Sequence, residues 1–107
     1  MSLPHVDDRT FQTEVLESDV PVMVDFYATW CGPCKAMDPT VTALAQEYEG
    51  RAKIVKVNIE EAPGIASSHG IMAVPTLIVF KNGAELQKMT GAKSKPELEK
   101  ALQSAIG

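Results

Sequence analysis

Two cysteines, Cys31 and Cys34, are the residues of this chain best placed to do chemistry. They are its only cysteines, and a glycine and a proline separate them. A pair at this spacing can bind a metal, form a structural disulfide, lie inertly in a core or exchange electrons with other thiols. The rest of the sequence supports these four alternatives unequally.

A metal site is poorly supplied with ligands. Structural zinc takes four ligands, usually from two cysteine pairs or from added histidines. This chain has one pair, and its histidines, His5 and His69, lie far from that pair in the sequence. We therefore expect no metal. Ligands shared across a dimer stay open as an alternative, as does an inert buried pair.

A structural disulfide is not needed to hold the chain together. Its 107 residues, 45% of them hydrophobic, suffice for a single domain, 1–107, with an ordinary core. The formal net charge of −4, without a run of Lys or Arg, argues against nucleic acid as a partner. With no apolar run long enough for a membrane helix and no secretory signal, we expect no membrane partner and a cytoplasmic location. The alternative is a mature chain from which a targeting segment has been removed. In a reducing compartment, two cysteines favour catalysis or metal binding over a structural disulfide.

A redox role accounts for every residue of the segment WCGPC, 30–34. Cys31 is expected at the exposed start of a helix, where free backbone N–H groups and the helix dipole lower the pKa of a thiol. Cys34 would lie one turn further in, close enough for a disulfide with Cys31. Gly32 would let a substrate backbone approach, Pro33 suits a first helical turn, and Trp30 offers a flat apolar surface.

The elements that position the pair are predicted by hydrophobic pattern and turn residues. Residues 3–6 are a short edge strand, residues 21–28 a buried strand leading into the cysteines, and residues 52–60 a second buried strand. A hairpin turns at Asn82-Gly83, and the last helix begins with the capping-box spacing of Ser94 and Glu97. The order β-α-β-α-β-α-β-β-α predicts an α/β fold with a mixed five-stranded sheet flanked by four helices. The cysteines then fall at the carboxyl end of the central strand, where sites collect.

The ordered set of motifs resembles the thioredoxin family over essentially the whole chain. It consists of VDFYA, WCGPC, VPT some forty residues on, and KNG after that. The resemblance implies the thioredoxin fold and the reduction of protein disulfides, with Cys31 as the nucleophile and Cys34 as the resolving cysteine. It also implies disulfide-containing protein substrates and thioredoxin reductase as the electron donor. We expect no bound cofactor, since no dinucleotide or phosphate loop is present, and we expect a monomer.

Asp25 is the one charged residue of its apolar strand. Burial among apolar neighbours would raise its pKa. Two roles remain open and are compatible with each other. One is an ion pair with Lys56 of the next strand, and the other is the proton relay to Cys34 that the resemblance implies.

The resemblance further implies a surface on which substrates dock. A cis peptide bond before Pro75 would lie against the cysteines, the alternative being an ordinary trans proline that starts a strand. The implied docking residues are Trp30, Ile59, Val74, Gly91 and Ala92. For Ile59, a plain core position explains the residue equally well. Pro39 is a supporting residue that we expect to kink the helix after the cysteines.

The chain departs from the commonest family pattern at Tyr27, where a tryptophan often stands, and at Met72, where relatives often carry a basic residue. The second departure favours partners with more apolar or less acidic surfaces. The Gly-Pro between the cysteines resembles the reducing members of the family, whereas a histidine before the second cysteine marks the oxidising ones. An oxidant or isomerase, and a binding subunit without turnover, are the competing functions.

Overall fold

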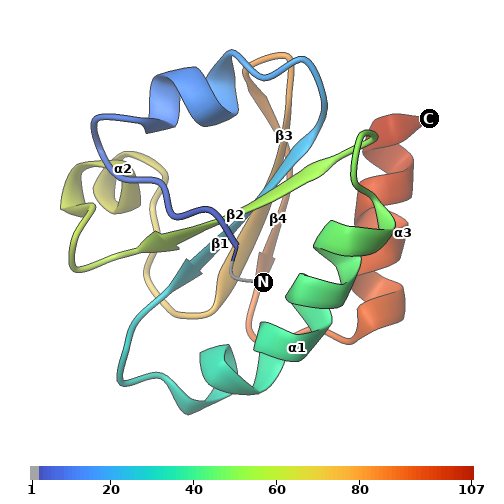
Figure 1. The fold of residues 1–107 in the computed structure, drawn as a ribbon. Helices are drawn as coiled ribbons and strands as arrows, with labels where there is room; N and C mark the ends of the chain where they lie inside the picture. Colours follow the sequence, from blue (N-terminus) through green and yellow to red (C-terminus); the bar gives the residue numbers. More distant parts are fainter. Residues whose placement is uncertain (1–2) are drawn as a thin grey trace.

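The computed structural model describes residues 3–107, which form a mixed sheet with helices on both faces (Figure 1). The elements follow in the order η1 (Gln12–Leu16, a short π-helix), β1 (Val22–Tyr27), α1 (Gly32–Glu47), β2 (Lys53–Asn58), α2 (Pro63–Ser68), β3 (Thr76–Lys81), β4 (Ala84–Thr90) and α3 (Lys95–Ile106). The four strands lie in the order β2-β1-β3-β4. β1 runs parallel to β2 and antiparallel to β3, which pairs in turn with β4. The mixed α/β fold is therefore confirmed.

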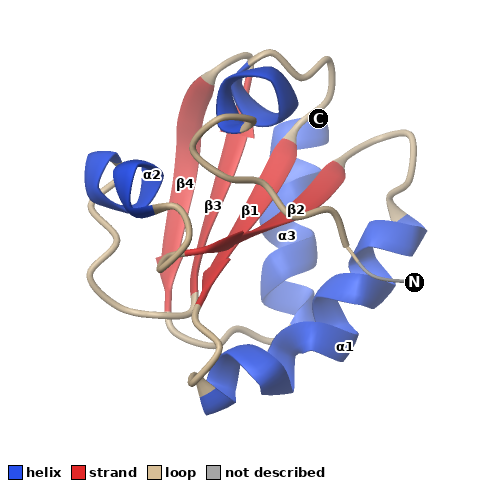
Figure 2. Ribbon diagram, turned by 60° about the vertical axis from the view of Figure 1, so that its left-hand side comes forward, coloured by secondary structure: helices blue, strands red, loops and turns tan. Residues whose placement is uncertain are grey.

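The two faces of β1 pack against different helices. Val22, Val24 and Phe26 belong to a core cluster with residues of η1 and α2, whereas Met23 belongs to a second cluster with residues of α1 and α3. Figure 2 shows α1 and α3 on one side of the sheet and the other two helices on the opposite side. Because side chains alternate along a strand, Asp25 points to the same face as Met23, beneath α1.

The prediction of a fifth strand at residues 3–6 is wrong. The segment does lie beside β2, where the N–H of Val6 donates to Lys56 O and the N–H of Lys56 donates to Pro4 O, each at 2.9 Å. These bonds make one isolated parallel bridge between His5 and Lys56. Pro4 has no N–H to donate and the segment is short, so the pairing does not extend into a strand.

The hairpin and the last helix are confirmed. Asn82 and Gly83 have φ values of 52° and 78°, the left-handed region that a tight two-residue turn requires. Ser94 caps α3 in a reciprocal capping box with Glu97. The hairpin brings the segment after β4 back beside the start of β3, where the N–H of Gly91 donates to Pro75 O at 2.8 Å.

Candidate active site

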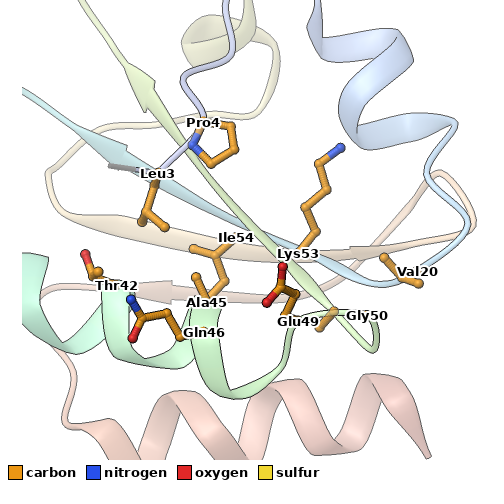
Figure 3. A pocket seen from close by; sticks show the side chains of 11 residues that line it. Leu3, Pro4, Val20, Thr42, Ala45, Gln46, Glu49, Gly50, Lys53 and Ile54 are labelled. Atoms are coloured by element: carbon orange, nitrogen blue, oxygen red, sulfur yellow. The ribbon is translucent and has the colours of Figure 1, made fainter. Parts of the chain in front are cut away.

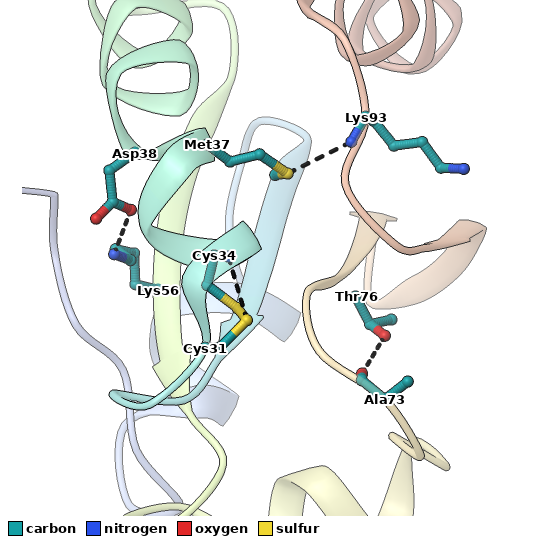
Figure 4. The surroundings of a disulfide bond; sticks show 8 residues. All are labelled: Cys31, Cys34, Met37, Asp38, Lys56, Ala73, Thr76 and Lys93. Carbon is teal, nitrogen blue, oxygen red and sulfur yellow. Dashed lines mark hydrogen bonds and ion pairs between the residues drawn. A yellow bond between two sulfur atoms is a disulfide. The ribbon is translucent and has the colours of Figure 1, made fainter.

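The cysteine pair lies where the chain passes from β1 into α1. Cys31 and Cys34 form a disulfide whose Cα atoms lie 5.3 Å apart (Figure 4). Cys31 is the N-cap residue of α1, and its Sγ accepts a hydrogen bond from the N–H of Cys34 at 3.1 Å. A helix N-terminus and a donated N–H both favour negative charge on an acceptor atom. The same position would stabilise the Cys31 thiolate in the reduced pair.

The prediction that Cys31 is exposed is wrong. Both cysteines are only 3% exposed in the disulfide form. They cluster with buried Ala28, and half-buried Ile59 and Val74 pack against that cluster. A helix start alone would leave Cys31 exposed, but loops that are distant in the sequence cover it. Access to the sulfurs must therefore pass the exposed residues around them.

Those exposed residues form a rim around the disulfide. Trp30 is 68% exposed, and Gly32, Pro33 and Ala92 are exposed as well. The rim is thus built from the loop that follows β1, the first turn of α1 and the segment after β4.

The loop that carries Val74 is held by two hydrogen bonds. The Val74-Pro75 peptide bond is cis, as the resemblance implied. The buried Thr76 hydroxyl donates to Ala73 O at 2.7 Å across this bond (Figure 4), and the N–H of Gly91 donates to Pro75 O. Val74 packs against the cysteine cluster, and half-buried Gly91 is held beside Pro75.

Asp25 is buried without a hydrogen-bond partner. Its residue is 1% exposed, and neither carboxylate oxygen has a partner among the described residues. Burial raises the pKa of Asp25 from its ordinary value of 3.8 to about 6, with Lys56 lowering it and Asp38 raising it. A carboxyl group of this pKa can accept or release a proton near neutral pH.

The direct ion pair between Asp25 and Lys56 is not formed. The Lys56 ammonium binds Asp38 instead, with 2.7 Å between Nζ and Oδ1 (Figure 4). It also lies 4.3 Å from the centre of the Tyr27 ring. The Asp38 side chain is 45% exposed, whereas Asp25 is buried. Asp38 keeps part of its hydration in this pair, whereas Asp25 is buried, which favours Asp38 as the partner of Lys56.

Asp38 is the residue of this region that the sequence analysis missed. It lies four residues after Cys34, and hence on nearly the same side of α1. This four-residue spacing from Cys34 was the feature of the sequence that could have identified Asp38. Pro39 follows it as an exposed residue inside α1, which continues to Glu47.

A hollow lies at the other end of α1. Its volume is about 470 Å³, and it opens between the start of the chain, the end of α1 and β2 (Figure 3). The charged residues in its lining are Glu49 and Lys53, and the Lys53 ammonium is bound to Glu14 at 3.0 Å. It contains no cysteine and no buried carboxylate, so it offers none of the chemistry found at the disulfide.

Within residues 3–107, no group of three or more His, Cys, Asp or Glu side chains is arranged to hold a metal ion. In the same part of the chain, no helix has the length and apolar character needed to span a membrane.

A disulfide at the N-terminus of a helix, directly after a central strand that carries a buried carboxylic acid, is the arrangement of a thiol–disulfide oxidoreductase. Comparisons with known proteins agree. The thioredoxin family model matches residues 2–104, and the chain belongs to the thioredoxin family. It is 51% identical to thioredoxin 1 of Nostoc sp. over 94% of both chains, and 45% identical to the thioredoxin of Porphyra purpurea over 99% of both. It is also 44% identical to the chloroplastic thioredoxin M4 of Arabidopsis thaliana, over 96% of this chain and 53% of that protein. The protein is a protein-disulfide oxidoreductase with a redox-active Cys31–Cys34 pair.

Proposed function

We propose that Cys31 attacks protein disulfides and that Cys34 resolves the product. The Cys31 thiolate attacks one sulfur of the substrate disulfide, and the other substrate sulfur leaves as a thiolate that takes up a proton. The Cys34 thiol then loses its proton and attacks Cys31 Sγ, which releases the second substrate sulfur. Two electrons pass to the substrate, and the Cys31–Cys34 disulfide forms. The N-cap hydrogen bond to Cys31 Sγ is the observation that carries this assignment.

Asp25 is the proposed acceptor for the Cys34 proton. It lies on the face of β1 that α1 covers, and Cys34 is a buried residue of α1. Its carboxylate has no competing hydrogen-bond donor in the described structure. Its pKa of about 6 leaves it ionised at neutral pH, with enough basicity for proton transfer.

The rim around the disulfide is the proposed docking surface for substrate proteins. Within this rim, Trp30 and Ala92 offer apolar contact, and Ile59 and Val74, which pack against the cysteine cluster, extend the apolar surface inward. Extended substrate segments can then pair with exposed backbone while side chains meet the apolar rim.

Electrons for the next cycle are proposed to come from thioredoxin reductase, so that the chain works as a carrier in electron transport. A pair that works as a reductant must be kept reduced, which favours a reducing compartment such as the cytoplasm. We propose the cytoplasm and a monomer. Fractionation of cells that express the full-length protein tests the first, and light scattering of the purified chain tests the second.

The experiment is reduction of a disulfide-bearing protein such as insulin, with dithiothreitol as the electron source. Cys34→Ser should accumulate mixed disulfides on a non-reducing gel, whereas Cys31→Ser should accumulate none. Equal trapping by both variants would overturn the assigned roles. Full-length protein that binds but does not reduce the substrate would identify a binding subunit.

Two further measurements sharpen the function. The reduction potential against glutathione separates a reductant from an oxidant or isomerase. Titration against an NADPH-dependent and a ferredoxin-dependent reductase then identifies the electron donor. A potential well above that of the glutathione pool would contradict the reductant role.

A further inference from the structure

Three polar groups on the α1 side of the sheet form a cluster that thiol–disulfide exchange leaves without a role. The Lys56 ammonium lies 2.7 Å from Asp38 Oδ1 and 4.3 Å from the centre of the Tyr27 ring. The Lys56 side chain is only 13% exposed. The ammonium is therefore held between an acid of α1 and an aromatic ring of β1, not spread into solvent.

This cluster lies directly beside Asp25. Lys56 and Asp25 are register partners on neighbouring parallel strands. Both side chains point to the α1 face. Asp25 is two residues from Met23 and Lys56 is two residues from Ile54, and both Met23 and Ile54 belong to the core cluster on that face. Neighbouring strands lie about 5 Å apart, so the flexible Lys56 stem is long enough to reach either acid. It binds Asp38 and leaves both Asp25 oxygens unpaired.

We propose that Asp38 is a positioning residue, which holds the Lys56 ammonium on the helix side and so keeps the Asp25 carboxylate unpaired and able to accept a proton. This inference rests on the proposed role of Asp25. A carboxylate bound to an ammonium group is a weaker base, because protonation would first have to break the ion pair. Holding Lys56 elsewhere removes that obstacle at the moment Cys34 is deprotonated.

Few charged groups of the described residues lie near Asp25. Lys56 faces it from β2 and Asp38 from α1, while Tyr27 lies two residues on along β1. On β3 its register partner is the apolar Leu77. Loss of the Asp38 charge removes a repulsion and also frees Lys56 to approach. Both effects lower the proton affinity of Asp25, so the sign of the expected change is fixed.

The test follows Asp25 in the oxidised protein, in which the disulfide sulfurs do not titrate. The carboxyl-carbon NMR shift of Asp25 is recorded against pH for the parent chain, Asp38→Asn and Asp38→Glu. Asp38→Asn should move the titration midpoint down by about one pH unit, as expected when an opposite charge comes within about 6 Å. Asp38→Glu keeps the charge and should restore most of the parent midpoint. An unmoved midpoint in Asp38→Asn would overturn the proposal.

A second pair of variants separates positioning from simple repulsion. In a Lys56→Gln background, Asp38→Asn can act only through its own charge. The downward movement should then be much smaller than in the parent background, a non-additive result for contacting residues. An equal movement in both backgrounds would show that Asp38 does not act through Lys56.

The rate of mixed-disulfide release distinguishes this inference from the proposed function. Single-turnover release should follow the Asp25 midpoint, so its pH profile in Asp38→Asn should move in the same direction. If Asp25 titrates as expected but Asp25→Asn releases substrate at the parent rate, positioning stands and the proton-relay role fails. Thermal melting of each variant confirms that it is folded at every pH measured.

Discussion

The two faces of β1 are formed by alternate residues of one short strand, and they have different roles. On the face toward η1 and α2, Val22, Val24 and Phe26 are completely buried among apolar neighbours. On the face toward α1, the apolar Met23 is followed by two residues with polar groups, Asp25 and Tyr27. The first face holds the sheet to its helices, and the second carries the buried acid Asp25 and Tyr27, which packs against the cysteine cluster.

The difference shows where this fold accepts a cost in stability. An ionised carboxylate without a partner is unfavourable in a dry interior. It is tolerated one residue away from Phe26, whose face is wholly apolar and closely packed. Strain of this kind gathers at functional sites and is offset by packing elsewhere. The adjacent residues of β1 therefore give a direct way to test the separation of stability from chemistry.

The largest expected effect is on the apolar face. Phe26→Ala should lower the free energy of unfolding by about 3–5 kcal/mol, because it removes a completely buried ring and leaves a cavity. Disulfide reduction per folded molecule should not change. Urea denaturation of the oxidised protein and the insulin assay measure the two quantities. Phe26→Leu is the matched control, with an expected loss below about 1.5 kcal/mol. A slower rate in folded Phe26→Ala would mean that the two faces are not separable.

Asp25→Asn should move stability the other way. The folded pKa of about 6 exceeds the ordinary value of 3.8, so the folded state binds the proton more tightly than the unfolded state does. The contribution of Asp25 to stability is therefore most favourable at pH values below 3.8, falls as the pH rises toward 6, and stays reduced above it. The deficit corresponds to about 3 kcal/mol at neutral pH. The variant should be more stable than the parent at pH 7–8, by up to this amount, and no more stable at pH 3. A less stable variant at pH 7 would show that Asp25 is held by favourable contacts.

The same substitution should slow the chemistry. Release of the mixed disulfide should fall by about a hundredfold, the usual contribution of a positioned proton acceptor, while the first attack by Cys31 changes much less. Single-turnover kinetics with a fluorescent peptide disulfide resolve the two steps. An unchanged release rate would make Asp25 a structural residue. Opposite movement of stability and rate in one variant would be the clearest sign of a functional site on this face.

Several features of the fold and the start of α1 are predicted from sequence because each depends on local residues. The N-cap position of Cys31, the turn at Asn82-Gly83 and the capping box at Ser94 each depend on residues within a few positions of one another. The apolar run of β1 likewise predicts a central strand that leads into the cysteines. Local spacing is enough to place these features.

What the sequence does not predict depends on distant contacts. Lys56 binds Asp38, 18 residues away, only because α1 lies across β2. Cys31 is buried because the loops of Ile59 and Val74 close over it. The segment at residues 3–6 forms one bridge instead of a strand, since Pro4 cannot donate a ladder hydrogen bond. Which of the two acids binds the Lys56 ammonium depends on how deeply each acid is buried, and a single sequence does not give that burial.

Trp30 extends the comparison from buried to exposed apolar residues. Phe26 and Trp30 are both aromatic, but Trp30 is 68% exposed and lies beside the disulfide. Trp30→Ala should leave the unfolding free energy nearly unchanged and should raise KM for insulin about tenfold, as for an aromatic anchor at an interface. The rate with a small aromatic disulfide that needs no docking surface should change little. Equal losses with both substrates would place Trp30 in the chemistry instead of in docking.

The smallest expected effect concerns the last residue of β1. Tyr27 presents its ring to the Lys56 ammonium, with 4.3 Å between Nζ and the ring centre. Tyr27→Leu keeps an apolar side chain but removes the ring's attraction for the cation, so unfolding should become easier by about 0.5–1 kcal/mol. Tyr27→Phe keeps the ring and is the matched control, with a smaller loss. Since Asp38 still holds Lys56 in both variants, the titration midpoint of Asp25 should not move. Equal destabilisation by Leu and Phe would show that the ring contributes nothing to Lys56. A shifted Asp25 midpoint in Tyr27→Leu alone would mean that the ring shares the positioning role assigned to Asp38.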